Sequence, residues 1–250
     1  LAQVKSPTGG AILRVRLTDN VPRSQVFAPM HWTGETAPSG RIDALVPGFV
    51  DPVSGQPESK AAVASVTRFD AAWYGFAVSV TQPTFNCDYW ARARTERGYR
   101  AELAGIQTPA DWEAEARTLF DAQDAQVSML SDPGRGVVRL AFERQGRLIA
   151  ALFVASSPVA VMRDYVATRL GQSAAGVLLG RTPADVPDPG PTLCSCFGVG
   201  LNTIAREVEA EGLQTVEEVG EALRAGTNCG SCRPEIAALM AQIKMPQAAE

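Results

Sequence analysis

The chain has 250 residues, of which 46% are hydrophobic and 20% are charged, and its formal net charge at pH 7 is −4. This composition is typical of a globular protein with one or two sizeable cores, and the length favours more than one folding unit. The acidic balance and the lack of a basic stripe imply no nucleic-acid partner. The longest apolar run, Leu148 to Ala155, is far shorter than the roughly 20 residues of a membrane-spanning helix, so we expect no membrane partner.

The first residues do not have the pattern of a signal peptide, in which a charged segment precedes an apolar one. The chain starts at Leu1 in strand-like sequence rather than at a methionine. We therefore expect a cytoplasmic protein, and we expect this chain to be the tail of a longer polypeptide.

Residues 1–66 alternate short β-rich runs with turns that contain proline and glycine. The run from Ala11 to Leu17 has the period of two that is typical of a strand. Helical periodicity is almost absent from this region. The pattern predicts part of a β-barrel or of another β-rich domain.

Residues 67–182 mix strand and helix patterns. Two apolar runs, Val137–Glu143 and Leu148–Val154, flank the turn sequence Gln145-Gly146 and predict a hairpin. The segment Val159–Leu170 follows a proline and predicts a helix. This region is therefore expected to be an α+β connector domain, and the proline-rich residues 183–191 are expected to be a linker.

The last region, residues 192–245, predicts three helices. The first is Asn202–Glu211, closed by Gly212. The second opens at the capping box that starts at Thr215 and ends at Gly226. The third starts at Pro234, and its apolar residues lie on one face: Ile236, Leu239, Met240 and Ile243.

Four of the five cysteines lie in this last region, in two tight pairs. Cys194 and Cys196 form a C-x-C pair, and Cys229 and Cys232 form a C-x-x-C pair. Such pairs predict a site of four thiolates, which suits zinc and iron–sulfur clusters about equally by softness. The C-x-C spacing favours a two-iron cluster, whose ligands spread over two metals; structural zinc and disulfides stay open as alternatives. Because a module of about 60 residues has a marginal core, the metal should supply much of its stability.

The residues around these cysteines carry a specific resemblance. The segments Cys194–Gly200 and Gly226–Glu235 resemble the domain of bacterioferritin-associated ferredoxin, which holds a 2Fe-2S cluster with four cysteines. The resemblance implies that the ligands of such a cluster are Cys194, Cys196, Cys229 and Cys232.

The other regions carry a second resemblance. Val26–Trp32 and Asp51–Lys60 are similar to the end of the molybdopterin dinucleotide-binding domain of molybdenum oxidoreductases, and are closest to the large subunit of assimilatory nitrate reductases. Asp88–Arg92 and Gly146–Phe153 are similar to the connector of those nitrate reductases that end in the ferredoxin-like module. The resemblance thus covers nearly the whole chain.

The resemblance implies a multidomain α+β protein. Its parts would be a partial β-barrel of the molybdopterin dinucleotide-binding domain, an α+β connector, and a small all-α domain that binds the 2Fe-2S cluster. The family's 4Fe-4S domain and catalytic domains have no counterpart in this sequence, so we assign no catalytic residue and expect this chain alone not to reduce nitrate.

The resemblance also implies a function, in which the cluster relays electrons toward a molybdenum centre that reduces nitrate to nitrite. The expected cofactors are the cluster and molybdopterin guanine dinucleotide, for which this chain holds a partial site. The expected partner is an electron donor, namely a ferredoxin, a flavodoxin or an NADH-dependent reductase subunit. A rival interpretation is a structural or iron-responsive interaction module, whose metal holds a docking surface and carries no electrons.

Five residues are candidates for contact with the dinucleotide. His31 and Trp32 offer a ring donor and a stacking face, Gln56 and Lys60 offer donors to carbonyl and phosphate oxygens, and Asp51 opens the second segment of the resemblance. The alternative for His31 and Trp32 is ordinary packing in a β-rich domain. The fifth cysteine, Cys87, has no second thiol or histidine nearby in sequence and is expected to be unreactive.

Overall fold

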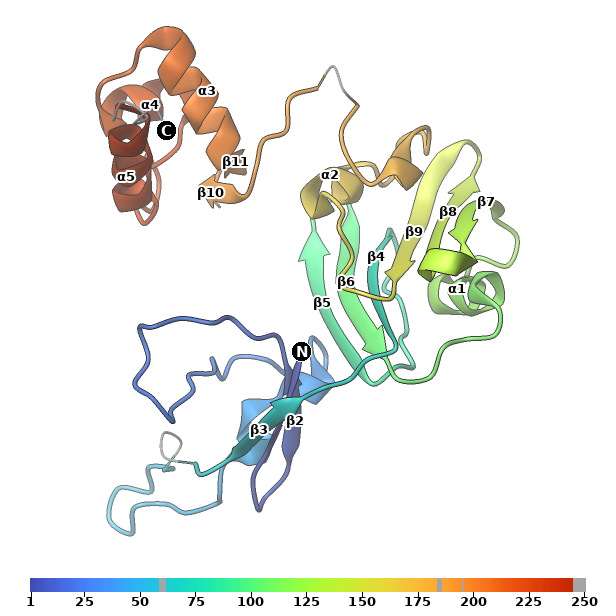
Figure 1. The fold of residues 1–250 in the computed structure, drawn as a ribbon, viewed down its shortest axis with the longest axis vertical. Helices are drawn as coiled ribbons and strands as arrows, with labels where there is room; N and C mark the ends of the chain where they lie inside the picture. Colours follow the sequence, from blue (N-terminus) through green and yellow to red (C-terminus); the bar gives the residue numbers. More distant parts are fainter. Residues whose placement is uncertain (59–61, 184–185, 195, 245–250) are drawn as a thin grey trace. The chain divides into compact units, whose positions relative to one another are not determined.

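The fold is described from a computed structural model (Figure 1), which describes residues 1–58, 62–183, 186–194 and 196–244. The chain divides into two compact units, Leu1–Arg181 and Thr182–Glu250. In the part of the chain that the structure describes, no helix has the length and apolarity needed to cross a membrane. The predicted boundary at residues 66 and 67 and the predicted linker at 183–191 stay predictions.

The start of the first unit is a three-stranded antiparallel sheet in the order β2-β1-β3. Its strands are β1 (Ala2–Lys5), β2 (Gly10–Leu13) and β3 (Ser65–Arg68), and two short 3-10 helices follow β2, η1 (Pro38–Gly40) and η2 (Ile42–Leu45). A small core lies between the sheet and η2, formed by Val4, Ala11 and Leu45 with Leu13 and Ile42.

One prediction for this region is wrong in detail. The strand predicted over Ala11–Leu17 ends at Leu13, because the residues beyond it have no neighbouring strand among the described residues and Leu17 is 92% exposed. The three strands form an open sheet in which β2 and β3 each pair on one side only, and the predicted partial barrel stays a prediction. No closed barrel is present among the described residues.

The rest of the first unit is built on a six-stranded antiparallel sheet in the order β5-β6-β4-β9-β8-β7. Its elements are β4 (Trp73–Ser79), β5 (Tyr89–Thr95), β6 (Gly98–Gly105), α1 (Trp112–Phe120), β7 (Gln126–Asp132), η3 (Pro133–Arg135), β8 (Val137–Arg144), β9 (Arg147–Ala155), α2 (Arg163–Thr168) and η4 (Val177–Leu179). The predicted hairpin is confirmed as β8 and β9. Gln145 and Gly146 both have positive φ, as a two-residue hairpin turn requires.

Each face of the large sheet carries its own core. Strand residues alternate between the two faces, so that Leu140 and Leu152 pack with residues of α1 while Phe153 packs with residues of α2. The helix predicted over Val159–Leu170 is confirmed only for Arg163–Thr168. It starts late because the backbone at Met162 is extended and its N–H donates to the carbonyl of Gly180.

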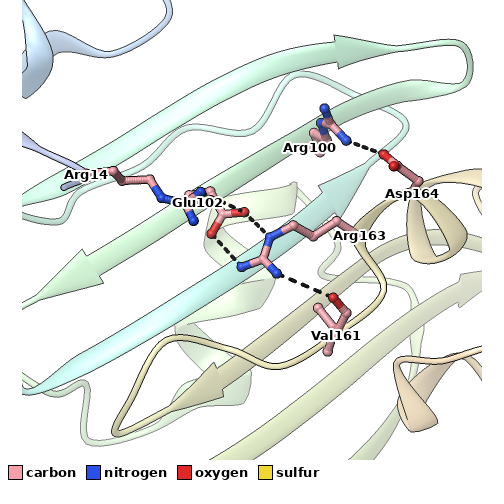
Figure 2. Close-up of polar contacts among 6 residues, drawn as sticks. All are labelled: Arg14, Arg100, Glu102, Val161, Arg163 and Asp164. Carbon is pink, nitrogen blue, oxygen red and sulfur yellow. Dashed lines mark hydrogen bonds and ion pairs between the residues drawn. The ribbon is translucent and has the colours of Figure 1, made fainter. Parts of the chain in front are cut away.

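Charged residues connect α2 with β6, as Figure 2 shows. The guanidinium of Arg163 donates to both carboxylate oxygens of Glu102, at 3.0 Å for the Nη2 to Oε2 bond. Beside it, Arg100 pairs with Asp164 at 2.5 Å. Glu102 also lies 3.8 Å from the guanidinium of Arg14, the residue that follows β2, so this carboxylate lies between two positive charges.

The described residues of the second unit form three helices and a short sheet. The helices are α3 (Leu201–Glu211), α4 (Val216–Leu223) and α5 (Arg233–Lys244), and the sheet pairs β10 (Thr192–Cys194) with β11 (Val199–Gly200). Their shared core contains Ile204 from α3, Val219 from α4 and Ile236 from α5.

Most of the predicted helix signals are confirmed. Gly212 closes α3 in the left-handed conformation, and Thr215 and Glu218 form the predicted capping box. Two details differ. The helix α4 ends at Leu223 rather than Gly226, because Arg224 already adopts the left-handed conformation. The domain predicted to be all helical also contains the sheet β10-β11, which turns the chain back around the first cysteine pair.

Candidate functional site

The four paired cysteines come from two loops of the second unit. Cys194 ends β10 and Cys196 lies in the turn that follows it; Cys229 and Cys232 lie between α4 and α5, with Cys232 directly before α5. Gly226 has a φ of 81°, a left-handed conformation that glycine adopts without strain. Its backbone N–H donates to the thiols of both Cys194 and Cys232.

The sulfur atoms gather in two pairs. The Sγ of Cys196 lies 3.3 Å from the Sγ of Cys229, and the side chains of Cys194 and Cys232 are hydrogen-bonded to each other. The second pair is buried, with exposed fractions of 2% for Cys194 and 6% for Cys232, whereas Cys196 and Cys229 are exposed. Each pair therefore joins one residue of the C-x-C segment with one of the C-x-x-C segment.

The surroundings of the sulfurs favour a thiolate in each pair. Burial opposes ionisation of Cys194, but hydrogen bonds from Gly226, Phe197 and Cys232 lower its pKa, while burial raises the pKa of Cys232. Hydrogen bonds from the hydroxyl and the backbone N–H of Ser231 lower the pKa of Cys229 to about 7. The thiolate is the form that binds metal, so both pairs are prepared for ligation.

This arrangement suits a two-iron cluster. All five cysteines are free thiols. In the described part of the chain, no group of three or more His, Cys, Asp and Glu side chains is placed to hold one metal ion. Two separate sulfur pairs instead fit a cluster whose four thiolate ligands are divided between two irons. The donor set and its pairing fit a 2Fe-2S cluster, and the assignment of these cysteines as its ligands stays a prediction.

Four of the residues predicted to contact the dinucleotide, His31, Trp32, Asp51 and Gln56, lie on exposed segments of the first unit. His31 and Trp32 are exposed, Trp32 to 41%. Asp51 accepts hydrogen bonds from the backbone N–H groups of Val53 and Ser54 and from the Ser54 hydroxyl, and these bonds lower its pKa. Asp51 therefore shapes its own turn.

Gln56 closes that turn, because its carbonyl accepts from the Asp51 N–H at 2.9 Å. Within the described residues, no hydrogen bond links His31 or Trp32 to Asp51 or Gln56. Lys60 lies outside the described residues. These five contacts with the dinucleotide stay predictions.

Arg92 of β5 is a residue that the sequence analysis did not single out. Its guanidinium donates to the carbonyls of Glu35 at 2.7 Å and Pro83 at 3.2 Å, and its backbone N–H donates to the carbonyl of Thr36 at 2.7 Å. The strand β5 thus holds the segment that directly follows His31 and Trp32. Arg92 is the last residue of a segment that carries the resemblance, which is the signal that could have marked it.

The fifth cysteine, Cys87, belongs to the first unit. Cys87 lines a cavity of about 610 Å³ with Trp73, Phe85 and Trp112, and its Sγ lies 3.2 Å from the carbonyl of Tyr89. Burial raises the pKa of Cys87 to about 12. This thiol is protonated at neutral pH, in agreement with the prediction that it is unreactive.

Each end of the chain matches a known protein family. Residues 1–63 match the Molydopterin dinucleotide binding domain, and residues 192–242, which include all four paired cysteines, match the BFD-like [2Fe-2S] binding domain. The chain therefore joins a region that matches a molybdopterin dinucleotide-binding domain to a region that matches a 2Fe-2S-binding domain. The two predicted cofactors are confirmed at this level.

Individual relatives narrow the class. The chain is 34% identical to a nitrate reductase of Klebsiella oxytoca over 99% of its own length and 29% of that protein. Its cysteine-rich end is 47% identical to the nitrogen fixation protein NifU of Leptolyngbya boryana, over 20% of the chain and 24% of that protein. The same end is 37% identical to the nitrogen fixation protein NifU of Trichormus azollae, over 26% of the chain and 22% of that protein. The predicted resemblance to nitrate reductases is thereby confirmed.

The chain spans less than a third of the length of these curated relatives. No solved structure is significantly similar to it.

Proposed function

We propose that this chain is the C-terminal portion of an assimilatory nitrate reductase of the cytoplasm, in which the cysteine-rich unit relays electrons toward a molybdenum centre. The observation that carries the proposal is similarity to a nitrate reductase along 99% of the chain, together with a thiol set arranged in two pairs. Reduction of nitrate to nitrite and water consumes two electrons and two protons, so a one-electron carrier serves it in two successive transfers.

A 2Fe-2S cluster, when bound, supplies reversible one-electron transfer. The residues of the chain have other tasks. The four cysteines supply thiolates, and the N–H of Gly226 and the hydroxyl of Ser231 donate hydrogen bonds to three of these sulfurs. The core around Ile204 and Ile236 excludes water from the inner side of the site.

The first unit has a binding task in this proposal. The exposed segments around His31 and Gln56 would contact the guanine dinucleotide, and β5 would hold the first of them in place through Arg92. The electron donor would be a ferredoxin, a flavodoxin or an NADH-dependent reductase subunit, and nitrate would be the substrate of the parent protein.

The test is spectroscopic. The purified chain is examined under anaerobic conditions by ultraviolet–visible and EPR spectroscopy, before and after dithionite, with analysis of iron, zinc and acid-labile sulfide. We expect two irons and two sulfides per chain, and an EPR signal of one unpaired spin after reduction. A cluster that disintegrates on reduction would rule out the relay.

A second candidate is a structural or iron-responsive interaction module. The similarity of the cysteine-rich end to NifU proteins favours it, because this unit also occurs in proteins with another name and function. Stoichiometric zinc in anaerobically purified protein, with no iron and no visible absorption, would support this candidate.

A further inference from the structure

The two thiol pairs differ in their access to water. Cys194 and Cys232 belong to the core cluster with Ile204 and Ile236, whereas Cys196 and Cys229 lie in exposed turns. If each sulfur pair held one iron, a cluster bound by these four sulfurs would have one iron on the core side and one on the solvent side. The 3.3 Å separation of the outer sulfurs brings both within reach of a single metal.

The outer pair has a hydroxyl beside it. The Oγ of Ser231 lies 3.0 Å from the Sγ of Cys229, and the backbone N–H of Ser231 also donates to that sulfur. The inner sulfurs receive hydrogen bonds from backbone groups, chiefly from Gly226. Both pairs therefore have hydrogen-bond donors, but the outer pair combines a side-chain donor with contact with solvent.

Electrostatics makes these two sites unequal for an added electron. Reduction changes one Fe³⁺ to Fe²⁺ with one electron from a one-electron donor, breaks no bond and makes the cluster more negative. Added negative charge costs less free energy near water than in a low-dielectric core. Hydrogen bonds to a ligand sulfur stabilise the reduced form in the same way and raise the reduction potential.

We propose that each pair holds one iron, that the added electron resides on the iron held by Cys196 and Cys229, and that Ser231 is a positioning residue that sets its potential. The proposal rests on the proposed electron-relay function. It makes the turn at Cys196 and the loop at Cys229 the point where a donor delivers its electron.

The first test is Ser231→Ala in the full chain with its cluster, measured by a redox titration that is monitored by EPR. The midpoint potential should become more negative, while Ser231→Thr should keep it near the original value. The matched control is Thr227→Val, which removes a hydroxyl from the same loop. Thr227 donates to the carbonyl of Arg224 at 2.7 Å and should leave the potential unchanged. An unchanged or more positive potential in Ser231→Ala would overturn the role of Ser231.

The second test exchanges one ligand in each pair. Oxygen is a harder ligand than sulfur and favours Fe³⁺, so a serine ligand should lower the potential most at the iron that is reduced. We expect a larger shift for Cys229→Ser than for Cys232→Ser. Equal shifts, or a larger shift for Cys232→Ser, would overturn the localisation. If the unchanged chain binds no reducible cluster, the proposed function itself fails, and that result is separate from both tests.

Discussion

Replacing Glu102 with glutamine removes the carboxylate that joins β6 to α2 (Figure 2). In the wild type, Arg163 binds both oxygens of Glu102, and its guanidinium also lies 5.3 Å from the ring centre of Phe76. The side chains of Glu102 and Arg163 are 23% and 30% exposed. Glutamine keeps the shape and one acceptor, but it removes the charge and the second acceptor.

The expected loss follows from this geometry. Hydrogen bonds to charged groups contribute about 1.5–3 kcal/mol each, and partial exposure reduces that value through solvent screening. We therefore expect Glu102→Gln to destabilise the first unit by about 1–2 kcal/mol, an estimate that combines both effects. For a unit of this size the melting temperature falls by about 2–4 °C for each kcal/mol.

The assay is differential scanning calorimetry at low salt, with Asp164→Asn as the matched control. Asp164 pairs with Arg100 between the same two elements, but these side chains are 66% and 41% exposed, so the control should lose about 1 kcal/mol or less. A double-mutant cycle with Arg163→Met isolates the energy of the pair. If Asp164→Asn destabilises the unit as much as Glu102→Gln, burial and bidentate geometry do not decide the strength of these pairs.

Three further predictions concern other parts of the chain. Arg92→Ala should speed amide hydrogen exchange in residues 31–37, because it removes the side-chain hydrogen bonds to the carbonyls of Glu35 and Pro83. Mass spectrometry measures this exchange. The control is Arg94→Ala, which should leave the exchange unchanged, because the side chain of Arg94 contacts Tyr99 of the adjacent strand instead. Cys229→Ala, which leaves no ligand atom at this position, should lose the cluster and expose residues 192–245 to proteolysis. Circular dichroism should still report a folded first unit, because the two units have separate cores; loss of the whole structure at once would contradict this. Burial raises the pKa of Cys87 to about 12. Above the unfolded-state pKa of about 8.5, the unfolded chain loses the thiol proton while the native state retains it. The free energy of unfolding therefore falls by up to about 1.4 kcal/mol per pH unit. Urea unfolding at pH 8–11 should show this fall in the wild type and a smaller one in Cys87→Ala, and equal slopes would refute it.

Local signals explain which elements were predictable. The turn Gln145-Gly146 sits between two apolar runs, and the capping box at Thr215 lies within one turn of helix, so each is encoded by adjacent residues. Predictions failed where a contact with a residue distant in sequence determines where an element begins or ends. The residues after Leu13 resemble a strand but have no neighbour to pair with, and α2 is shortened by a hydrogen bond between Met162 and the distant Gly180.

Long-range contacts also explain what the sequence analysis missed at the candidate site. Arg92 contacts carbonyls more than 50 residues earlier in the chain, at Glu35 and Thr36, and no spacing rule connects those positions. The cysteines show the same limit. Their spacing predicts a set of four ligands, but which sulfurs would share a metal depends on how two separate loops approach each other.

The direction of that approach accounts for the unequal exposure of the two pairs. The first cysteine of one loop pairs with the last cysteine of the other, so Cys194 meets Cys232 and Cys196 meets Cys229. Cys194 ends β10 and Cys232 directly precedes α5, and both elements pack in the core. Cys196 and Cys229 are in turns and therefore face solvent. An antiparallel approach of a C-x-C and a C-x-x-C segment thus produces one buried and one exposed pair of sulfurs, and the proposed localisation of the added electron rests on this asymmetry.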